Sequence, residues 1–418
     1  MIDRRMLTTL LASTAVAPVL SPRPSWGQAA KSKAVFYASV GSELTLYGMN
    51  VEDAALEKRG AVTLPANVQY AWPHPSKHYF YVVSSGGGPG VASDQNFANA
   101  FRIDLATGAL TPHGQPQNLP SRPIHTSVDI AGEYLLTAYN DPSSLTVHRI
   151  NRDGTLGARV DQPNRLDTGK YAHQIRATPD NQQVILVTRG NNAPGDNPVN
   201  PGSLKTFAFK DGVLTQLAAI QPGDGMHFGP RHLDFHPTQP WVYVSIESQN
   251  KLYVYRRDAA TGLSREPIFI KETLSDPKSP ARQGAGTIHV HPNGHTLYLA
   301  NRASATVEFE GKKVFAGGEN SIAAFSIDQS TGEPTLIRNI DGRGITLRTF
   351  GLDPIGRMLV AASQIPLPVR DGATVKMLSA GLSVYRIGAD GELDFVRKYD
   401  VDVGGKNQFW SGVVALGA

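Results

Sequence analysis

Two short sequence units recur along the chain, and this repetition limits the possible folds more than any other feature. The first unit is a turn followed by a short apolar strand, and it begins at six positions: His74, Asp129, Thr178, His236, His291 and Asp353. The second unit is a pair of strands joined by a glycine turn, with glycines at Gly108, Gly154, Gly212, Gly262, Gly332 and Gly391. A degenerate seventh copy of the second unit begins at Leu46.

The spacing of the turn glycines predicts the architecture. Successive glycines lie 46, 58, 50, 70 and 59 residues apart, which is the length of a four-stranded propeller blade with variable loops. The chain is also rich in Gly and Pro, and it has almost no run of helix formers with a 3.6-residue apolar period. We therefore predict an all-β fold, a seven-bladed β-propeller that forms a single domain over residues 30–418.

Ring closure is expected to join the two ends of the chain. A closed ring protects the blade edges, so one blade should combine an N-terminal strand with C-terminal strands. We expect the strand AVFYASV near the N-terminus to share that blade with LSVYRIG and DFVRKYD.

The first 29 residues have the pattern of an export signal. Arg4 and Arg5 precede an apolar stretch from Met6 to Leu20, and small residues around Ala29 follow as a cleavage site. The paired arginines favour the twin-arginine route, which exports folded proteins. The apolar stretch is too short for a membrane anchor, so we expect a periplasmic or secreted protein with no stable membrane insertion after cleavage.

Charge and cysteine content exclude several classes of function. Residues 1–29 hold three arginines and one aspartate, so cleavage lowers the formal charge from +4 to +2. Without a Lys/Arg-rich run, the mature chain is not expected to bind nucleic acid. The absence of cysteine excludes disulfides, zinc–thiolate sites and thiol nucleophiles. The sequence does not fix the oligomeric state.

Four side chains from adjacent repeats are candidates for a functional site. His173 and Arg231 precede the third and fourth turn units, Glu247 ends the strand after Arg231, and Arg302 ends TLYLANRA, taken as the next innermost strand. Such positions line a propeller channel, where polar side chains from different blades can converge. We expect these four side chains to meet at one mouth of the channel.

Three segments carry a family resemblance: GPRHLDFHPTQPWVYVSIESQNKLYVY, TIHVHPNGHTLYLANR and YAHQIRATPD. They resemble the seven-bladed lactonase family, which includes bacterial 6-phosphogluconolactonase and the fungal carboxymuconate-lactonising enzyme. The similarity extends over essentially the whole mature chain. The resemblance implies that His173, Arg231, Glu247 and Arg302 form the catalytic set. Arg189 is a departure, because many relatives have an acidic residue near that strand end.

The residue types fit lactone chemistry in either direction. Hydrolysis needs a base for water, an acid for the leaving alkoxide and donors for the oxyanion. Glu247 and His173 can exchange protons, whereas Arg231 and Arg302 can hold a carboxylate or phosphate or stabilise the oxyanion. Hydrolysis of a sugar or related acidic lactone is the first choice, by analogy with bacterial relatives. Closure of a lactone from a muconate-like diacid, and an exported propeller that only binds a ligand or a protein, remain open.

Other polar residues have simpler interpretations. His74, His236 and His291 precede prolines in the turn units and are interpreted as turn or capping residues. For His125, His232 and His289 a structural hydrogen bond is the first expectation. Arg231 and Glu247 could likewise form a structural ion pair. His289 and His291 have no nearby carboxylate that completes a ligand set, so we expect neither a metal nor another cofactor.

Overall fold

The computed structural model describes residues 33–191 and 199–417. The export signal predicted for residues 1–29, and the first residues of the predicted domain, lie outside these ranges. In the part of the chain that is described, no helix is long and apolar enough to cross a membrane.

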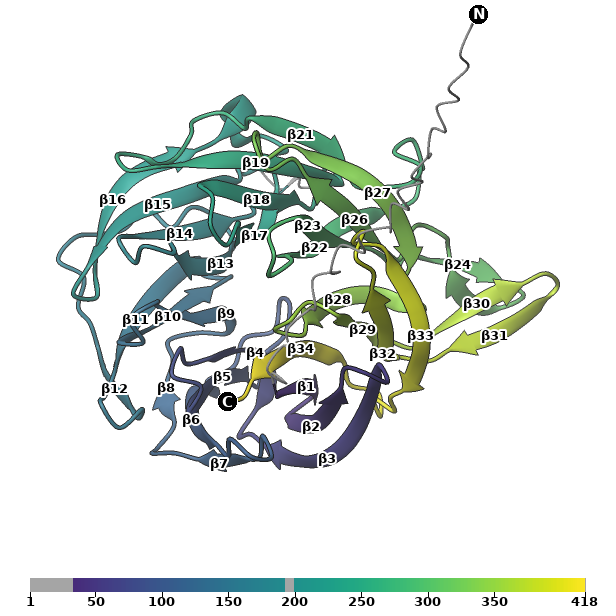
Figure 1. The fold of residues 1–418 in the computed structure, drawn as a ribbon, viewed down its shortest axis with the longest axis horizontal. Coiled ribbons are helices and arrows are strands. Elements are labelled where there is room, and N and C mark those ends of the chain that lie inside the picture. The colour runs from purple at the N-terminus through teal and green to yellow at the C-terminus, as the bar shows by residue number, and fades with distance from the viewer. Residues whose placement is uncertain (1–32, 192–198, 418) are drawn as a thin grey trace, which may run out of the picture.

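In the described ranges, seven antiparallel sheets of four or five strands are arranged in a ring around a central axis, as Figure 1 shows. Each sheet is one blade of a propeller, which confirms the predicted all-β, seven-bladed fold. Blades are numbered 1 to 7 in the order in which their innermost strands occur along the chain. Within the described ranges, the 3-10 turn η1 (Pro222–Gly225) is the only helical element.

The innermost strands line the channel. They are β4 (Asn67–Pro73), β9 (Pro123–Val128), β13 (Ala172–Ala177), β17 (Pro230–Phe235), β22 (Gln283–Val290), β28 (Ile345–Leu352) and β34 (Gln408–Ala415), in blades 1 to 7. The second strands, in the same blade order, are β5 (Tyr79–Ser85), β10 (Tyr134–Tyr139), β14 (Gln183–Thr188), β18 (Trp241–Ile246), β23 (Thr296–Ala303), β29 (Met358–Ile365) and β1 (Ala34–Val40).

The third and outer strands complete each blade. Third strands are β6 (Asn96–Ile103), β11 (Ser144–Ile150), β15 (Ser203–Lys210), β19 (Lys251–Asp258), β26 (Ser321–Ile327), β32 (Gly381–Ile387) and β2 (Glu43–Asn50). Outer strands are β7 (Leu110–Pro112) with β8 (Gln117–Asn118), β12 (Leu156–Arg159), β16 (Val213–Ile220), β20 (Gly262–Leu263) with β21 (Phe269–Glu272), β27 (Pro334–Asp341), β33 (Leu393–Asp400) and β3 (Ala55–Thr63).

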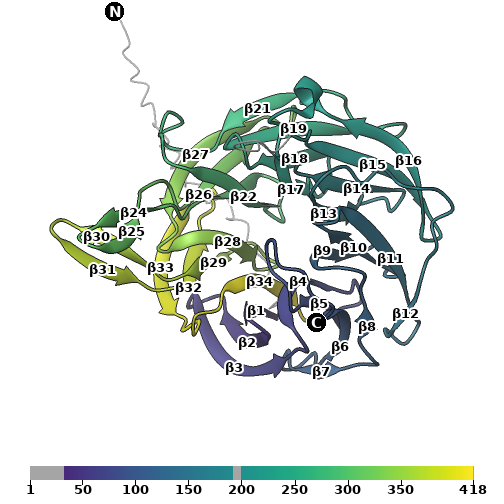
Figure 2. The same cartoon turned by 180° about the vertical axis from the view of Figure 1, so that it is seen from behind.

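Two hairpins extend beyond the ring. They link the second and third strands of blades 5 and 6, and both views show them side by side at the rim (Figures 1 and 2). Their strands are β24 (Thr306–Phe309), β25 (Lys312–Phe315), β30 (Leu367–Asp371) and β31 (Thr374–Leu378).

The closing blade differs from the sequence-based expectation. The strand AVFYASV is β1, and it pairs with the last strand, β34, rather than with LSVYRIG or DFVRKYD. Those two segments are β32 and β33, which complete blade 6. The prediction was wrong because β34 lies beyond the last repeat unit, so no copy of either unit marks it.

Apolar packing between blades holds the ring together. Each of seven buried clusters combines residues of two neighbouring blades, such as Tyr243 and Val254 of blade 4 with Ala285 and Leu297 of blade 5. A single blade leaves both of its apolar faces exposed, so the faces are buried only when the blades stack around the ring.

Hydrogen bonds between blades use the repeat residues themselves. His74, His236 and His291 each place Nε2 within 2.7–2.9 Å of a glycine carbonyl in the next blade's turn unit, which confirms their structural role. Tyrosines of second strands reach the glycine turns in the same way, and Tyr243 donates to the carbonyl of Gly332 at 3.0 Å. These turn glycines have φ near +80°, a conformation that favours glycine.

Replacing Tyr243 by phenylalanine is expected to lower the free energy of unfolding by about 1–2 kcal/mol, because it leaves a buried carbonyl oxygen without its donor. Chemical denaturation of the mature chain measures the change. The ring contacts of Tyr243 persist in the variant, so an unchanged midpoint would show that this hydrogen bond contributes nothing to stability.

Candidate active site

A repeated β-bulge shapes the inner wall of the channel. In all seven blades the pairing between the innermost and second strands shifts register near the start of the innermost strand. In blades 3, 4 and 6 the extra residues are His173, Arg231 and Arg348. Bulges redirect side chains next to functional sites, and here they direct three basic residues toward the channel.

The ends of the second strands meet the same mouth of the channel. Strands in a blade are antiparallel, so each second strand ends where its innermost partner begins. Arg189 and Glu247 directly follow β14 and β18, and Arg302 lies near the end of β23. Arg302 is therefore on a second strand, and the expectation that TLYLANRA is an innermost strand was wrong.

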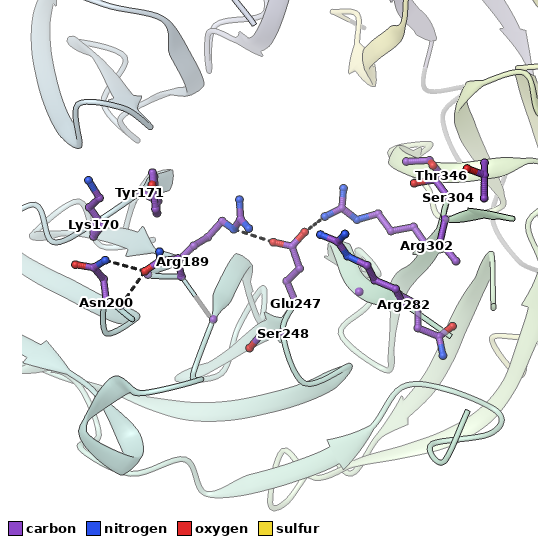
Figure 3. Close-up of a pocket in the computed structure, with 18 residues that line it drawn as sticks. Lys170, Tyr171, Arg189, Asn200, Glu247, Ser248, Arg282, Arg302, Ser304 and Thr346 are labelled. Atoms are coloured by element: carbon purple, nitrogen blue, oxygen red, sulfur yellow. Dashed lines mark hydrogen bonds and ion pairs between the residues drawn. The ribbon is translucent and has the colours of Figure 1, made fainter. Parts of the chain in front are cut away.

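Glu247 is the centre of an ion-pair cluster, which Figure 3 shows in part. Its Oε1 accepts a hydrogen bond from Arg231 at 3.1 Å and another from Arg302, and Arg189 Nε lies 2.8 Å from Oε2. The Glu247 side chain is 19% exposed, whereas that of Arg231 is 4% exposed and lies beneath it. The cluster thus has a buried side and a side that faces solvent.

The arginines determine the protonation state of Glu247. Burial alone would raise its pKa, but the charges of Arg231, Arg302 and Arg189 outweigh burial and hold the pKa well below the usual range for glutamate. Glu247 is therefore ionised at neutral pH and accepts hydrogen bonds only. Burial lowers the pKa of Arg231 to about 9, so this guanidinium still carries its charge at neutral pH.

An open cavity of about 1070 Å³ lies above the cluster. Among the residues that the structure describes, its walls carry four cationic side chains, Lys170, Arg189, Arg282 and Arg302, and one carboxylate, that of Glu247. Figure 3 shows Arg282 extending toward Glu247 and Arg302. This excess of positive charge favours an anionic ligand.

Only part of the set of four site residues predicted from the sequence meets at the pocket. Glu247 and Arg302 line it, and Arg231 contacts Glu247 from below. His173 does not line the pocket. Its ring lies 5.1 Å from that of His232, and its Nδ1 has no hydrogen-bond partner among the described residues. The expected ion pair between Arg231 and Glu247 is present, and it belongs to the same cluster.

Three buried imidazoles lie along the channel, on the innermost strands of blades 2, 3 and 4. His232 lies between the other two, with ring centroids 6.2 Å from His125 and 5.1 Å from His173. Its Nδ1 is 3.3 Å from the Thr287 hydroxyl, whereas Nε2 of His125 has no hydrogen-bond partner in the part of the chain that the structure describes. The expectation of a satisfied structural hydrogen bond is thus met for His232 and only in part for His125.

At the other end of β17, Asp234 forms a separate ion-pair cluster. The Nδ1 atom of His289 and the Nη1 atom of Arg176 each lie 3.4 Å from this carboxylate. The contact of His289 fits its expected structural role. Within the described ranges, no three His, Cys, Asp or Glu side chains are grouped in a way that could hold a metal ion.

The buried imidazoles predict a fall in stability in mild acid. Burial, followed by nearby arginine charges, holds the pKa of His125, His173 and His232 well below the ordinary value of 6.5. The unfolded chain therefore binds more protons than the native protein below about pH 6.5. Stability should be nearly constant between about pH 8 and pH 7 and fall as the pH decreases further, by at most about 1.4 kcal/mol per pH unit for each histidine.

Denaturation midpoints between pH 8 and pH 5 measure this dependence. His125→Phe keeps an aromatic ring against Tyr70 and should make the slope shallower. His78→Phe, at an exposed position, should leave the slope unchanged. Equal slopes for the wild type and His125→Phe would contradict this interpretation.

Fold and site together define a β-propeller protein with a cationic ligand pocket at one mouth of its channel. The family model described as "Lactonase, 7-bladed beta-propeller" matches residues 34–366. The chain belongs to this seven-bladed β-propeller lactonase family.

Similar proteins carry related names. A 6-phosphogluconolactonase of Bacillus subtilis is 27% identical over 337 residues, which cover 78% of this chain and 86% of the relative. A 6-phosphogluconolactonase of Pectobacterium carotovorum is 26% identical over 366 residues, covering 85% and 90%. The periplasmic gluconolactonase of Pseudomonas aeruginosa superposes with a TM-score of 0.72 at 19% identity, over 92% of this chain and all of that one. The last comparison supports the fold.

Proposed function

We propose that this protein hydrolyses a lactone that carries an acid group, and that the reaction takes place in the pocket around Glu247. One observation carries the proposal. Glu247 is an ionised carboxylate that lines the pocket, and three arginines hold it in place. Membership of the lactonase family, and relatives named 6-phosphogluconolactonase, support the choice of reaction.

In this proposal Glu247 is the general base. Water attacks the lactone carbonyl and gives a proton to Glu247, the acyl–oxygen bond of the ring breaks, and the proton passes to the leaving ring oxygen. Arg302 lines the pocket beside Glu247 and would stabilise the oxyanion. Arg231 lies beneath and would fix the position of the carboxylate. His173 does not line the pocket, and its lowered pKa keeps it neutral at neutral pH, so this proposal gives it no proton-transfer step.

The low pKa of Glu247 also suggests why the substrate should be acidic. In the free protein the arginines stabilise the carboxylate so strongly that it is a weak base. A bound anion would compete for the same arginines and raise the pKa of Glu247 toward its usual value. Substrate binding would thereby activate the base.

The test is a comparison of substrates with the mature chain. Gluconolactone, its 6-phosphate and other sugar lactones are followed by proton release, and carboxymuconate by ultraviolet absorbance. The proposal expects saturable opening, faster for a lactone with an added acid group. Turnover of carboxymuconate alone would favour the lactonising reaction, for which the pocket also offers enough guanidinium groups to hold a diacid. Turnover of no compound would favour a binding protein.

We also propose that the protein is exported through the twin-arginine route and acts in the periplasm or outside the cell. Fusing residues 1–30 to a reporter that is exported only when folded should move the reporter out of the cytoplasm. Replacing Arg4 and Arg5 by lysine should retain it there, because this route depends on the arginine pair. Export of the lysine variant at the original level would contradict the proposed route.

A further inference from the structure

Arg348 is a half-buried cation for which the mechanism above has no use. It lies on β28 at the channel, and its guanidinium carbon is 3.6 Å from the centre of the Phe409 ring. Within residues 33–191 and 199–417, no carboxylate forms an ion pair with it. A buried guanidinium normally has such a partner, because burial removes its hydration.

The position of Arg348 is equivalent to that of two proposed site residues. His173, Arg231 and Arg348 are the bulge residues of blades 3, 4 and 6. Each lies five residues before the turn unit of its own repeat, at Thr178, His236 and Asp353. The β-bulge of blade 6 therefore directs Arg348 into the channel, just as the equivalent bulge of blade 4 places Arg231 under Glu247.

The charges around Arg348 are mostly of the same sign. Burial lowers its pKa, and Arg231, Arg302 and Arg122 lower it further, whereas Glu247 opposes this shift. Glu247 is already paired with three other arginines. Arg122 is a second guanidinium that pairs with no carboxylate in the described part of the chain. Its Nε donates to Gln69 Oε1 at 2.9 Å, and its guanidinium carbon lies 5.7 Å from the Phe409 ring.

The guanidinium groups of Arg348 and Arg122 lie next to the pocket. Thr346 lines the pocket and precedes Arg348 by two residues on β28. Arg122, Arg348 and Phe409 all keep some exposed surface, and each lies just before or near the start of an innermost strand, at the same end of the blades as the pocket. Figure 1 shows that β9, β28 and β34, which surround this point, lie nearest the central axis.

We propose that Arg348 and Arg122, grouped at the Phe409 ring, form a subsite that binds the phosphate or carboxylate group of a molecule held in the pocket. Such an anion would neutralise the two guanidinium groups and form charge-assisted hydrogen bonds with them. The identity of the molecule rests on the proposed lactonase function. The anion site itself rests on these two arginines, which form no ion pair with a carboxylate of the described residues.

The experiment measures binding rather than turnover. Gluconate and 6-phosphogluconate are titrated into the mature chain by calorimetry at fixed ionic strength, with inorganic phosphate as a third probe. We expect the phosphorylated acid to bind at least tenfold more tightly than gluconate. Arg348→Gln should abolish that difference, Arg122→Gln should reduce it, and Arg348→Lys should retain part of it.

Arg176→Gln is the matched control. Arg176 is also a half-buried arginine stacked on an aromatic ring, 4.6 Å from Trp72, but it pairs with Asp234 at the other end of the channel. The Arg176→Gln variant should leave the difference in affinity between 6-phosphogluconate and gluconate unchanged. Equal affinity of the wild type for both acids, or a full difference in folded Arg348→Gln and Arg122→Gln, would overturn the proposal. Because no lactone is used, a binding difference in a protein that opens no lactone would reject the lactonase function and keep the anion site.

Discussion

Replacing Glu247 by glutamine should reduce kcat/KM for lactone opening by about 10³-fold or more, because it removes the proposed general base and leaves three arginines without their counter-ion. Glutamine has nearly the same shape as glutamate and still offers an oxygen to Arg231. The variant should therefore be less stable but keep the native fold, and the loss of activity should appear in kcat. Steady-state proton release with the best substrate of the panel measures the effect.

The control for Glu247→Gln is Asp234→Asn. Asp234 is a carboxylate of similar exposure, paired with Arg176, at the other end of β17. Removing one partner of a buried ion pair costs about 3–5 kcal/mol, so both variants should be destabilised. Only Glu247→Gln should lose turnover. Equal turnover of Glu247→Gln and the wild type would reject Glu247 as the base, and equal losses in both variants would point to a general effect of destabilisation.

Replacing Arg302 by alanine should have the second largest effect, about 10²–10³-fold on kcat, which is typical for the loss of one oxyanion donor. Arg302 lines the pocket and hydrogen-bonds Glu247, whereas Arg231 lies beneath the carboxylate. The variant should also raise the pKa of Glu247, because one of its three paired charges is removed.

Arg302→Lys separates charge from geometry. Lysine keeps the positive charge but cannot present two parallel donors, so it should restore only part of the activity. Arg176→Ala is a suitable control, since it removes a half-buried arginine at the far end of the channel. A loss below about threefold in Arg302→Ala, measured with a folded variant, would exclude an oxyanion role for this residue.

The repeat pattern predicted the fold because each repeat unit marks a fixed place in a blade. The six turn units lead into the second strands of blades 1 to 6, and the six turn glycines mark the turns between third and outer strands. Strand β34 was missed because it stands alone after the last repeat. Its pairing with β1 depends on closure of the ring, which no local pattern encodes.

The position of a residue relative to the start of its turn unit explains how much of the site was predictable. Arg189, Glu247 and Arg302 each lie eleven residues after the start of a turn unit, so consecutive blades bring them together. The bulge residues lie five residues before that start, and this register also identifies Arg348. Aligning all six repeats, rather than the segments that resemble the lactonase family, would have found it.

Other parts of the site could not be read from the repeats. The burial of His173 beneath the pocket depends on packing against His232, which belongs to the next blade. Arg282 and Lys170 lie outside the two registers, and it is the folding of the loops that places them on the pocket wall. The extent to which the arginines lower the pKa of Glu247 likewise depends on distances between side chains, which only the folded ring determines.

A crystal structure of the mature chain with a bound hydroxy acid, the product of lactone opening, tests the proposed site most directly. Gluconate or 6-phosphogluconate is soaked at neutral pH, where Glu247 is ionised. The proposed site predicts a ligand in the mouth pocket, with its new carboxylate within hydrogen-bond distance of Arg302 and close to Glu247. A ligand bound at the opposite end of the channel near Asp234, or in the pocket with its carboxylate turned away from Arg302 and Glu247, would contradict it.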